Sequence, residues 1–334
     1  MKYGVYLPSF SKALDARELY NYNLGVAKTI EERRMDSIWV VDHLHAFDTV
    51  ERVEKSLNIL ESMTLLSALA ASTNKVLIGT SVLSSPFRNP ALLAKMATTL
   101  DIISNGRLIL GMGAGWRKDE FEGYGFGWES TTERLRRTTE AIEIIKKFWT
   151  QPIVDHEGEF YKMRGGQLWP KPIQKPRPKI MFGGVGFKAM ELAKYTDGWV
   201  APPLNADDLE ERINRFREWG IELDKFDIVY EFFTSVNAKR EIAYERSRDA
   251  LQRWFGDPLD EILAYDTQVQ LPHGISVRYG AVAGNVDDCI EGVMKFAKAG
   301  VKHFELHFMP LEDSIDGIRL YSEKVIPIVT EQFT

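Results

Sequence analysis

Short apolar runs alternate with amphipathic stretches along nearly the whole chain. Several of these runs are apolar at consecutive positions, which is typical of parallel strands that are covered on both faces. Each run is short enough to be a strand and is followed by turn residues or a helical pattern. Eight strands are predicted: Tyr3–Leu7, Ser37–Val41, Val76–Leu83, Arg107–Gly113, Lys179–Gly183, Gly198–Ala201, Ile228–Val236 and His303–Phe308.

Amphipathic helices are predicted between these strands. Pro90 marks one helix start, because a proline in the first turn loses no hydrogen bond. Eight strand–helix units in one chain favour a closed α/β barrel, the (β/α)8 or TIM barrel, over an open doubly wound sheet. The predicted helices are Arg17–Arg34, Ile59–Ala71, Ala91–Ile103, Thr132–Trp149, Lys188–Tyr195 and Asp287–Ala299.

Two segments depart from this rhythm and are predicted to be insertions. Ile153–Pro178 is rich in proline and glycine and contains the extended stretch Glu159-Phe160-Tyr161, so we expect a loop or hairpin there. Trp254–Asn285 contains Gly256-Asp257-Pro258 and is the second insertion. Segments of this length act as lids or make contacts between subunits, and both readings stay open. No linker or internal repeat interrupts the chain, which predicts one domain over residues 1–334.

Composition narrows the class of protein. The chain has 334 residues, of which 44% are hydrophobic and 27% are charged, as in ordinary globular proteins. A net charge of -6 with interspersed signs predicts no bulk attraction for nucleic acid or anionic lipid. The single cysteine, Cys289, excludes an intrachain disulfide. The chain shows no signal-peptide pattern and no apolar stretch of about 20 residues, so we expect a cytoplasmic protein without membrane contact.

The clearest candidate for catalysis follows the second predicted strand. Asp42 and His43 stand directly after Ser37–Val41, at the strand end where barrel enzymes place their catalytic groups. A histidine exchanges protons near neutral pH, and a neighbouring carboxylate can tune it. By pattern alone, such a pair is as often structural as catalytic. The chain has no His-Glu-x-x-His motif, no cysteine pair and no carboxylate cluster at ligand spacing, so no metal is predicted.

Two glycine-rich strand ends are candidates for cofactor binding. Gly111–Gly115 lacks the Rossmann spacing, but glycines there would let a flat ring approach the backbone. Gly183–Gly186 follows an apolar strand and opens a predicted helix, where free N–H groups form a phosphate site. The alternative is a tight turn, for which one glycine would suffice. The predicted contacts are Gly113, Gly115, Gly183, Gly184, Val185 and Gly186.

These segments resemble one known family. The stretches Trp39–Leu44, Ile78–Trp116, Ile180–Trp199 and Ala299–Phe308 are similar to the bacterial luciferase-like enzymes, and together they span nearly the whole chain. The resemblance implies a barrel that binds a flavin or deazaflavin at the C-terminal ends of its strands. It also implies cofactor phosphate in the glycine-rich loop after the fifth strand, and a homodimer.

The family divides by cofactor, and the chain resembles the branch that uses the deazaflavin coenzyme F420 for hydride transfer. In that branch the second strand ends in Asp-His-Leu, as in Asp42-His43-Leu44. The resemblance gives His43 a role in proton transfer, whereas Asp42 orients it or contacts the cofactor. It also places a non-proline cis peptide behind the ring, at Ser81-Val82.

One position departs from the sugar-phosphate dehydrogenases of this branch. They carry a glutamate where this chain has Trp116, which predicts an apolar or aromatic lining for an organic substrate. Some FMN-dependent monooxygenases share the sequence Gly-Trp followed by charges. The alternative function is therefore a monooxygenase that uses reduced FMN from a flavin reductase partner. A barrel that binds flavin without catalysis is the third reading.

Overall fold

The computed structural model describes residues 1–334 except 8–9, 12–13, 48–55, 256–266, 272–274 and 334. Eight parallel strands form a closed ring in the order β1-β3-β6-β8-β11-β12-β13-β17, with β17 pairing β1. The predicted barrel is therefore confirmed. Each predicted strand begins and ends within three residues of the strand in the structure. The strands are β1 Lys2–Tyr6, β3 Ser37–Val40, β6 Leu77–Thr80, β8 Leu108–Gly113, β11 Lys179–Gly183, β12 Gly198–Ala201, β13 Asp227–Val236 and β17 His303–Phe308.

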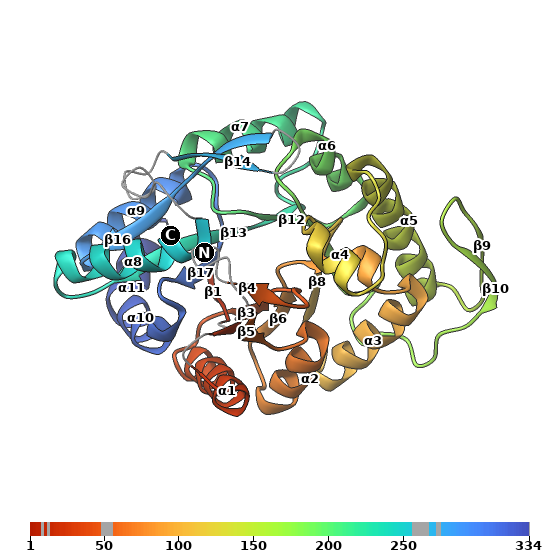
Figure 1. Ribbon diagram of the computed structural model, residues 1–334, viewed down its shortest axis with the longest axis horizontal. Helices are drawn as coiled ribbons and strands as arrows, with labels where there is room; N and C mark the ends of the chain where they lie inside the picture. Colours follow the sequence, from red (N-terminus) through yellow and green to blue (C-terminus); the bar gives the residue numbers. More distant parts are fainter. Residues whose placement is uncertain (8–9, 12–13, 48–55, 256–266, 272–274, 334) are drawn as a thin grey trace.

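Helices surround the strands as an outer ring (Figure 1). Side-chain caps explain where several begin: the side chain of Asp15 accepts from the backbone N–H groups of Arg17 and Glu18, and Ser130 forms a capping box with Glu133. The predicted helix Lys188–Tyr195 is instead one short α-helix followed by a 3-10 turn, Glu191–Tyr195. The α-helices of the ring are α1 Ala16–Glu32, α2 Ser62–Ser72, α3 Pro90–Ile103, α5 Thr131–Thr150, α6 Phe187–Met190, α7 Ala206–Glu218, α8 Arg240–Phe255, α9 Val286–Lys298, α10 Ser314–Leu320 and α11 Ile326–Gln332.

Apolar side chains pack on both faces of the strands. One layer fills the space between strands and helices. The other fills the barrel interior and includes Trp39, Ile109, Met181 and Val229. A Cβ on Gly79 would lie 2.2 Å from the ring of Trp39, so this strand glycine makes room for the largest interior side chain. The interior is therefore a packed core that supports the strand ends above it.

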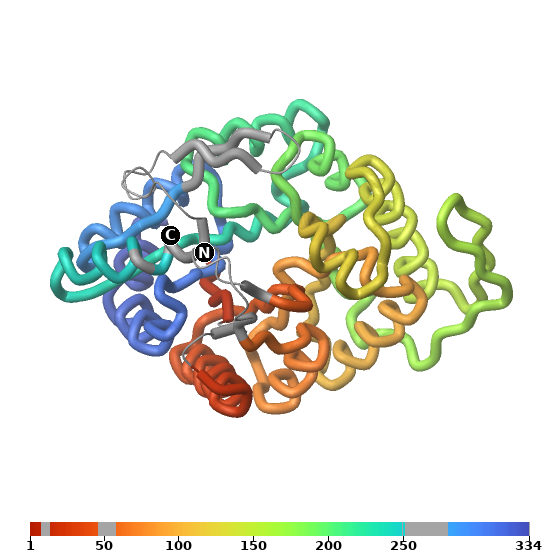
Figure 2. The backbone as a smooth tube through the Cα atoms, viewed as in Figure 1, coloured from red at the N-terminus to blue at the C-terminus, as the bar shows by residue number. Residues whose placement is uncertain are grey.

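The first insertion is a hairpin of β9 Val154–Glu157 and β10 Lys162–Gly166, which protrudes from the barrel in Figure 2. The prediction of a hairpin is confirmed, but the expected extended stretch is wrong, because Glu159 and Phe160 form the bend between the strands.

The second insertion is shorter than predicted. Trp254 and Phe255 still belong to α8, and β16 Ala281–Gly284 joins the barrel sheet parallel to β13. Between them, β14 Thr267–Leu271 and β15 Ile275–Tyr279 pair antiparallel. The predicted turn Gly256-Asp257-Pro258 lies outside the described residues. In the described part of the chain, no helix is long and apolar enough to cross a membrane.

Candidate active site

The candidate site lies where the first strands of the barrel end. The loops after β1 and β3 form a small sheet of β2 Phe10–Ser11, β4 Ala46–Phe47 and β5 Ser56–Ile59. The segment after β8 forms the short helix α4 Lys118–Gly123, which Figure 1 shows over the ring of strands. These connections bring residues from separate strand–helix units to the C-terminal end of the barrel, the end that carries the chemistry of this fold.

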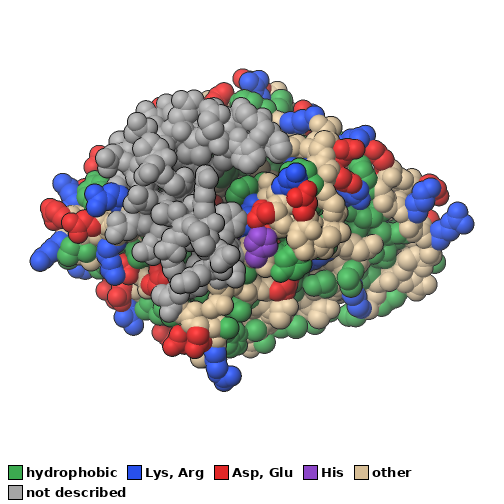
Figure 3. Space-filling model, viewed as in Figure 1, with side chains coloured by type: hydrophobic (Ala, Val, Ile, Leu, Met, Phe, Trp, Pro, Cys, Tyr) green, Lys and Arg blue, Asp and Glu red, His purple; other side chains and the backbone are tan. Residues whose placement is uncertain are grey.

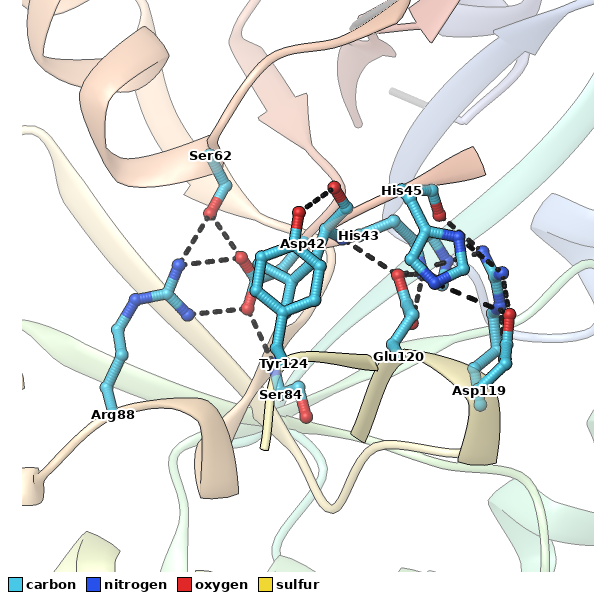
Figure 4. Close-up of polar contacts among 11 residues, drawn as sticks. Asp42, His43, His45, Ser62, Ser84, Arg88, Asp119, Glu120 and Tyr124 are labelled. Atoms are coloured by element: carbon cyan, nitrogen blue, oxygen red, sulfur yellow. Dashed lines mark hydrogen bonds and ion pairs between the residues drawn. The ribbon is translucent and has the colours of Figure 1, made fainter. Parts of the chain in front are cut away.

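His43 faces a buried carboxylate from α4 (Figure 4). Its Nδ1 lies 3.0 and 3.1 Å from the two carboxylate oxygens of Glu120. The backbone N–H of Leu44 donates to the same carboxylate at 2.8 Å, and Arg117 lies 3.6 Å from it. Burial opposes ionisation of Glu120, but the hydrogen bond and charge of His43, the charge of Arg117 and the Leu44 N–H outweigh it and lower its pKa. Glu120 thus fixes the orientation of the His43 ring.

Asp42 has a different set of partners from those predicted. Arg88 donates to both its carboxylate oxygens, at 2.6 and 2.8 Å, and the hydroxyl of Ser62 donates at 2.6 Å. The backbone N–H of Ser84 donates to it at 3.0 Å. The expectation that Asp42 orients His43 is therefore corrected: this buried carboxylate ties the end of β3 to the segment after β6.

Arg88 links this carboxylate to a helix start. The guanidinium also lies 2.5 Å from Glu61, whose side chain accepts from the backbone at the start of α2. Burial disfavours the charged guanidinium, but the two carboxylates outweigh it and raise its pKa. The two carboxylates share one guanidinium in a paired network, which fixes the backbone next to His43.

Trp116 lies against His43, as its predicted role at the site requires. The two rings meet edge to face at 5.9 Å between centroids, and Trp116 is 57% exposed. His45, the neighbouring histidine, is held differently: its ring stacks on Tyr124 and its carbonyl accepts from Arg117 at 2.6 Å. Figure 3 shows acidic and basic side chains gathered near a histidine on this face.

The glycine before Trp116 explains how Glu120 reaches His43. Gly115 has a φ of +71°, and a Cβ there would lie 2.5 Å from the Ser84 hydroxyl and 2.7 Å from the Phe121 ring. Only glycine fits both the backbone and the space. In this structure Gly115 turns the chain from β8 into α4, a structural role that is separate from the predicted cofactor contact.

The peptide between Ser81 and Val82 is cis, which confirms the prediction made for this position. The side chain of Val82 lies among strand glycines: a Cβ on Gly113 would be 2.9 Å from it, and one on Gly183 would be 2.5 Å away. These two glycines therefore make room for Val82 itself, a reason for glycine that the sequence analysis did not foresee.

The glycine-rich loop after β11 has the conformation of a tight turn that leads into α6. Gly184 has a φ of +152°, and Gly186 is the N-cap residue of α6. The loop carbonyls are fixed from outside, because the Trp199 ring N–H donates to Gly184 and Arg212 donates to Val185. The phosphate role of Gly183–Gly186 stays a prediction.

Sequence reasoning missed two acidic side chains near these residues. Glu120 lies in α4, a helix too short to show a periodic pattern. Glu305 lies on β17 inside the barrel, where Ser81 donates to it at 2.9 Å. The alternation of His303, Glu305 and His307 along a buried strand was the available signal, because residues two apart share one face. Among the described residues, no group of three or more His, Cys, Asp or Glu side chains could hold a metal.

A closed (β/α)8 barrel with a histidine–carboxylate pair at the C-terminal ends of its strands defines an enzyme of the TIM-barrel class. The model of the luciferase-like monooxygenase family matches residues 1–303, and the chain belongs to this family. The family comprises oxidoreductases that differ in cofactor.

Relatives with either cofactor are similar to the chain. An F420-dependent glucose-6-phosphate dehydrogenase from Microbacterium testaceum (strain StLB037) is 27% identical over 322 residues, 91% of this chain and 91% of the relative. An FMNH(2)-dependent dimethylsulfone monooxygenase from Pseudomonas putida is 37% identical over 139 residues, 42% of this chain and 38% of the relative. A solved F420-dependent secondary alcohol dehydrogenase in complex with an F420-acetone adduct matches 98% of both chains with a TM-score of 0.78 and 22% identity, which shows the shared fold.

Proposed function

We propose that the protein is an F420-dependent oxidoreductase that transfers a hydride between the deazaflavin and an organic substrate. The observation that carries this proposal is the His43–Glu120 pair at the barrel mouth, in a chain similar over 91% of its length to F420-dependent dehydrogenases. When bound, the cofactor supplies the hydride donor or acceptor. The chain's own residues then move the accompanying proton.

His43 is the proposed acid or base. Glu120 holds its Nδ1, while Nε2 has no hydrogen-bond partner within the described ranges. An imidazole fixed at one nitrogen can give or take a proton at the other. Asp42 acts through the backbone, because it fixes the end of β3 from which His43 projects.

The residues around the mouth fit a flat ring with a phosphate tail. Gly184 carries no side chain, and it has a φ of +152°, a conformation that other residues rarely adopt. Ser81, Val82, Gly113 and the loop 183–186 would hold the cofactor, with phosphate against the loop N–H groups.

We propose an uncharged substrate with an apolar part. Trp116 offers an exposed ring beside His43. The cations nearby are already committed to carboxylates: Arg88 to Asp42 and Arg117 to Asp119. These pairs disfavour a phosphorylated substrate like that named for the dehydrogenase relatives. A secondary alcohol or ketone with an apolar chain would meet these conditions.

Cofactor titration tests the proposal. Purified protein should bind F420 with a change in its absorbance spectrum and should bind FMN at least tenfold more weakly. Turnover with a panel of alcohols, read from F420 absorbance, should then exceed turnover with sugar phosphates. Tighter binding of FMN, with oxygen uptake when a flavin reductase supplies reduced flavin, would instead support the monooxygenase function that the local similarity to the dimethylsulfone monooxygenase favours.

We further propose a homodimer through α3. Leu92 is 58% exposed and Ile103 43% exposed on this helix. Trp169, 59% exposed, lies beside it, because Lys95 donates to its carbonyl at 2.5 Å. Ile173 lies at the end of the helix, where its N–H bonds to Asp101. Apolar side chains that gather in this way on one surface support its use as an association site.

A further inference from the structure

The barrel contains a buried carboxyl group that the proposed reaction does not use. Glu305 on β17 is fully buried, and the hydroxyl of Ser81 donates to its Oε2 at 2.9 Å. Its Oε1 is also buried and has no hydrogen-bond partner in the described part of the chain. Ser81 is only partly buried and stands at the C-terminal end of β6, next to the cis peptide. One hydrogen bond thus joins the barrel interior to the mouth.

The groups that face Glu305 do not neutralise a negative charge on it. Glu231 stands directly opposite on β13, so a second carboxyl group lies in the same layer. Glu231 is itself paired with His307 at 2.7 Å, and the ring of Tyr6 stacks on His307 at 4.0 Å. His307 is therefore paired with Glu231, whereas Glu305 has the Ser81 hydroxyl.

This environment disfavours the charged form of Glu305. Burial, and then the negative charge of Glu231, raise its pKa well above the ordinary value, while the Ser81 hydrogen bond lowers it only in part. A carboxyl group in the barrel interior could ionise only by placing a second negative charge opposite Glu231. The charged form of Glu305 is therefore strongly disfavoured in the folded protein.

The hydrogen bond to Glu305 constrains what Ser81 can do. A serine hydroxyl has one proton, and Ser81 uses that proton on Oε2 of Glu305. Its remaining lone pairs can then only accept a hydrogen bond from a group at the mouth. A ring N–H is the kind of donor that such an acceptor would bind.

We propose that Glu305 is a positioning residue for the cofactor ring, which it serves by holding the Ser81 hydroxyl as a hydrogen-bond acceptor at the barrel mouth. This inference rests on the proposed function, because it needs a ring at this place. It adds a residue inside the barrel that touches neither cofactor nor substrate.

The charge state can be tested without cofactor. Because the pKa of Glu305 is raised in the folded protein, we expect the folded chain to hold this proton at pH values above 4.5, the ordinary pKa, where the unfolded chain loses it. The wild type should therefore lose stability relative to Glu305→Gln as the pH rises above this value, because the variant has no proton to lose. Thermal unfolding from pH 4.5 to 8 should show a Tm difference that widens in favour of the variant. A constant difference would overturn the neutral-acid assignment and the proposal with it.

Cofactor binding tests the positioning role. Ser81→Ala and Glu305→Leu should each raise the Kd for the bound cofactor about tenfold, the effect of one lost hydrogen bond. Glu305→Gln should stay within about threefold of the wild type, because its amide oxygen still accepts from Ser81. Ser37→Ala is the matched control: this buried serine also bonds a β17 side chain, His303, but at the other end of the barrel. It should bind cofactor as the wild type does.

The outcomes separate the two proposals. Wild-type affinity in both Ser81→Ala and Glu305→Leu would overturn the positioning role and leave the proposed function intact. A Glu305→Gln variant as weak as Glu305→Leu would also overturn it, since a hydrogen-bond acceptor would then be insufficient. If the wild type binds neither F420 nor FMN, the proposed function fails and the ring-positioning role fails with it. Should Glu305→Leu not fold, Ser81→Ala decides alone.

Discussion

At the scale of single residues, the site depends on which carboxylate faces His43. A histidine beside an aspartate in sequence suggested Asp42, but adjacent residues at a strand end project in different directions. Glu120 from α4 takes that place, and Asp42 pairs with Arg88 instead. The chemistry of the site is therefore divided between one carboxylate that holds the imidazole and one that holds the backbone.

The first prediction at this scale concerns His43. His43→Ala should lower turnover about 10²–10⁴-fold with cofactor affinity within a few fold of the wild type, because a general acid or base acts mainly in the transition state. His45→Ala is the control, since His45 stacks on Tyr124 away from Glu120 and should lose much less activity. Single-turnover reduction or oxidation of bound cofactor is the measurement. Unchanged turnover in His43→Ala would contradict the assignment.

The second prediction concerns the charge of Glu120. Its pKa is lowered in the folded protein, so its ionised form stabilises the fold above the ordinary glutamate pKa of 4.5. This stabilisation is lost as the pH falls below that value through the folded pKa. Glu120→Gln should therefore unfold at a lower temperature than the wild type at pH 7, and the gap should narrow between pH 4.5 and pH 3. A gap that stays constant over this range would show that the charge contributes nothing.

At the scale of elements, the turn from β8 into α4 decides whether the site is assembled. Gly115→Ala would place a Cβ against Ser84 and Phe121 at a positive φ. Overpacking and backbone strain together should cost about 2–4 kcal/mol of unfolding free energy. Displacement of α4 would also move Glu120 and lower turnover.

Gly125→Ala is the matched control for this turn. Gly125 has nearly the same φ, +75°, but nothing lies within 4 Å of an added Cβ. Its substitution should cost only the backbone term, about 1 kcal/mol, and should leave turnover unchanged. Urea denaturation of the two variants measures the difference. Equal costs would mean that packing around Gly115 does not position α4.

At the scale of the whole molecule, the exposed face of α3 predicts the assembly. The wild type should have about twice the chain mass of 38.2 kDa in light scattering. Leu92→Glu combined with Ile103→Glu should shift it toward the monomer, because two charges cannot be buried in an apolar interface without partners. Ile328→Glu is the control, since the side chain of Ile328 on α11 has the same exposed fraction as that of Ile103, 43%. A monomeric wild type, or a dimer that survives the double substitution, would contradict the proposed interface.

The sequence by itself determined the barrel strands and six of the helices. Apolar runs and a proline at a helix start act within a few residues, so they could be read along the chain. All eight strands were found in this way, and the resemblance to a family located the cis peptide at Ser81-Val82. The same local reading failed at α4, because this helix is too short to show a periodic pattern. It also failed in Trp254–Asn285, where β16 joins the barrel sheet by pairing with β13.

Only the tertiary structure decided which side chains meet. Glu120 lies 77 residues from His43 in sequence, and Glu305 lies 224 residues from Ser81. Such pairs form because closure of the barrel brings separate strand ends together, and no periodic pattern encodes which distant residue faces which. The strand-end position of His43 could be predicted from the chain, whereas its carboxylate partner and the Ser81–Glu305 hydrogen bond beneath the mouth depend on barrel closure.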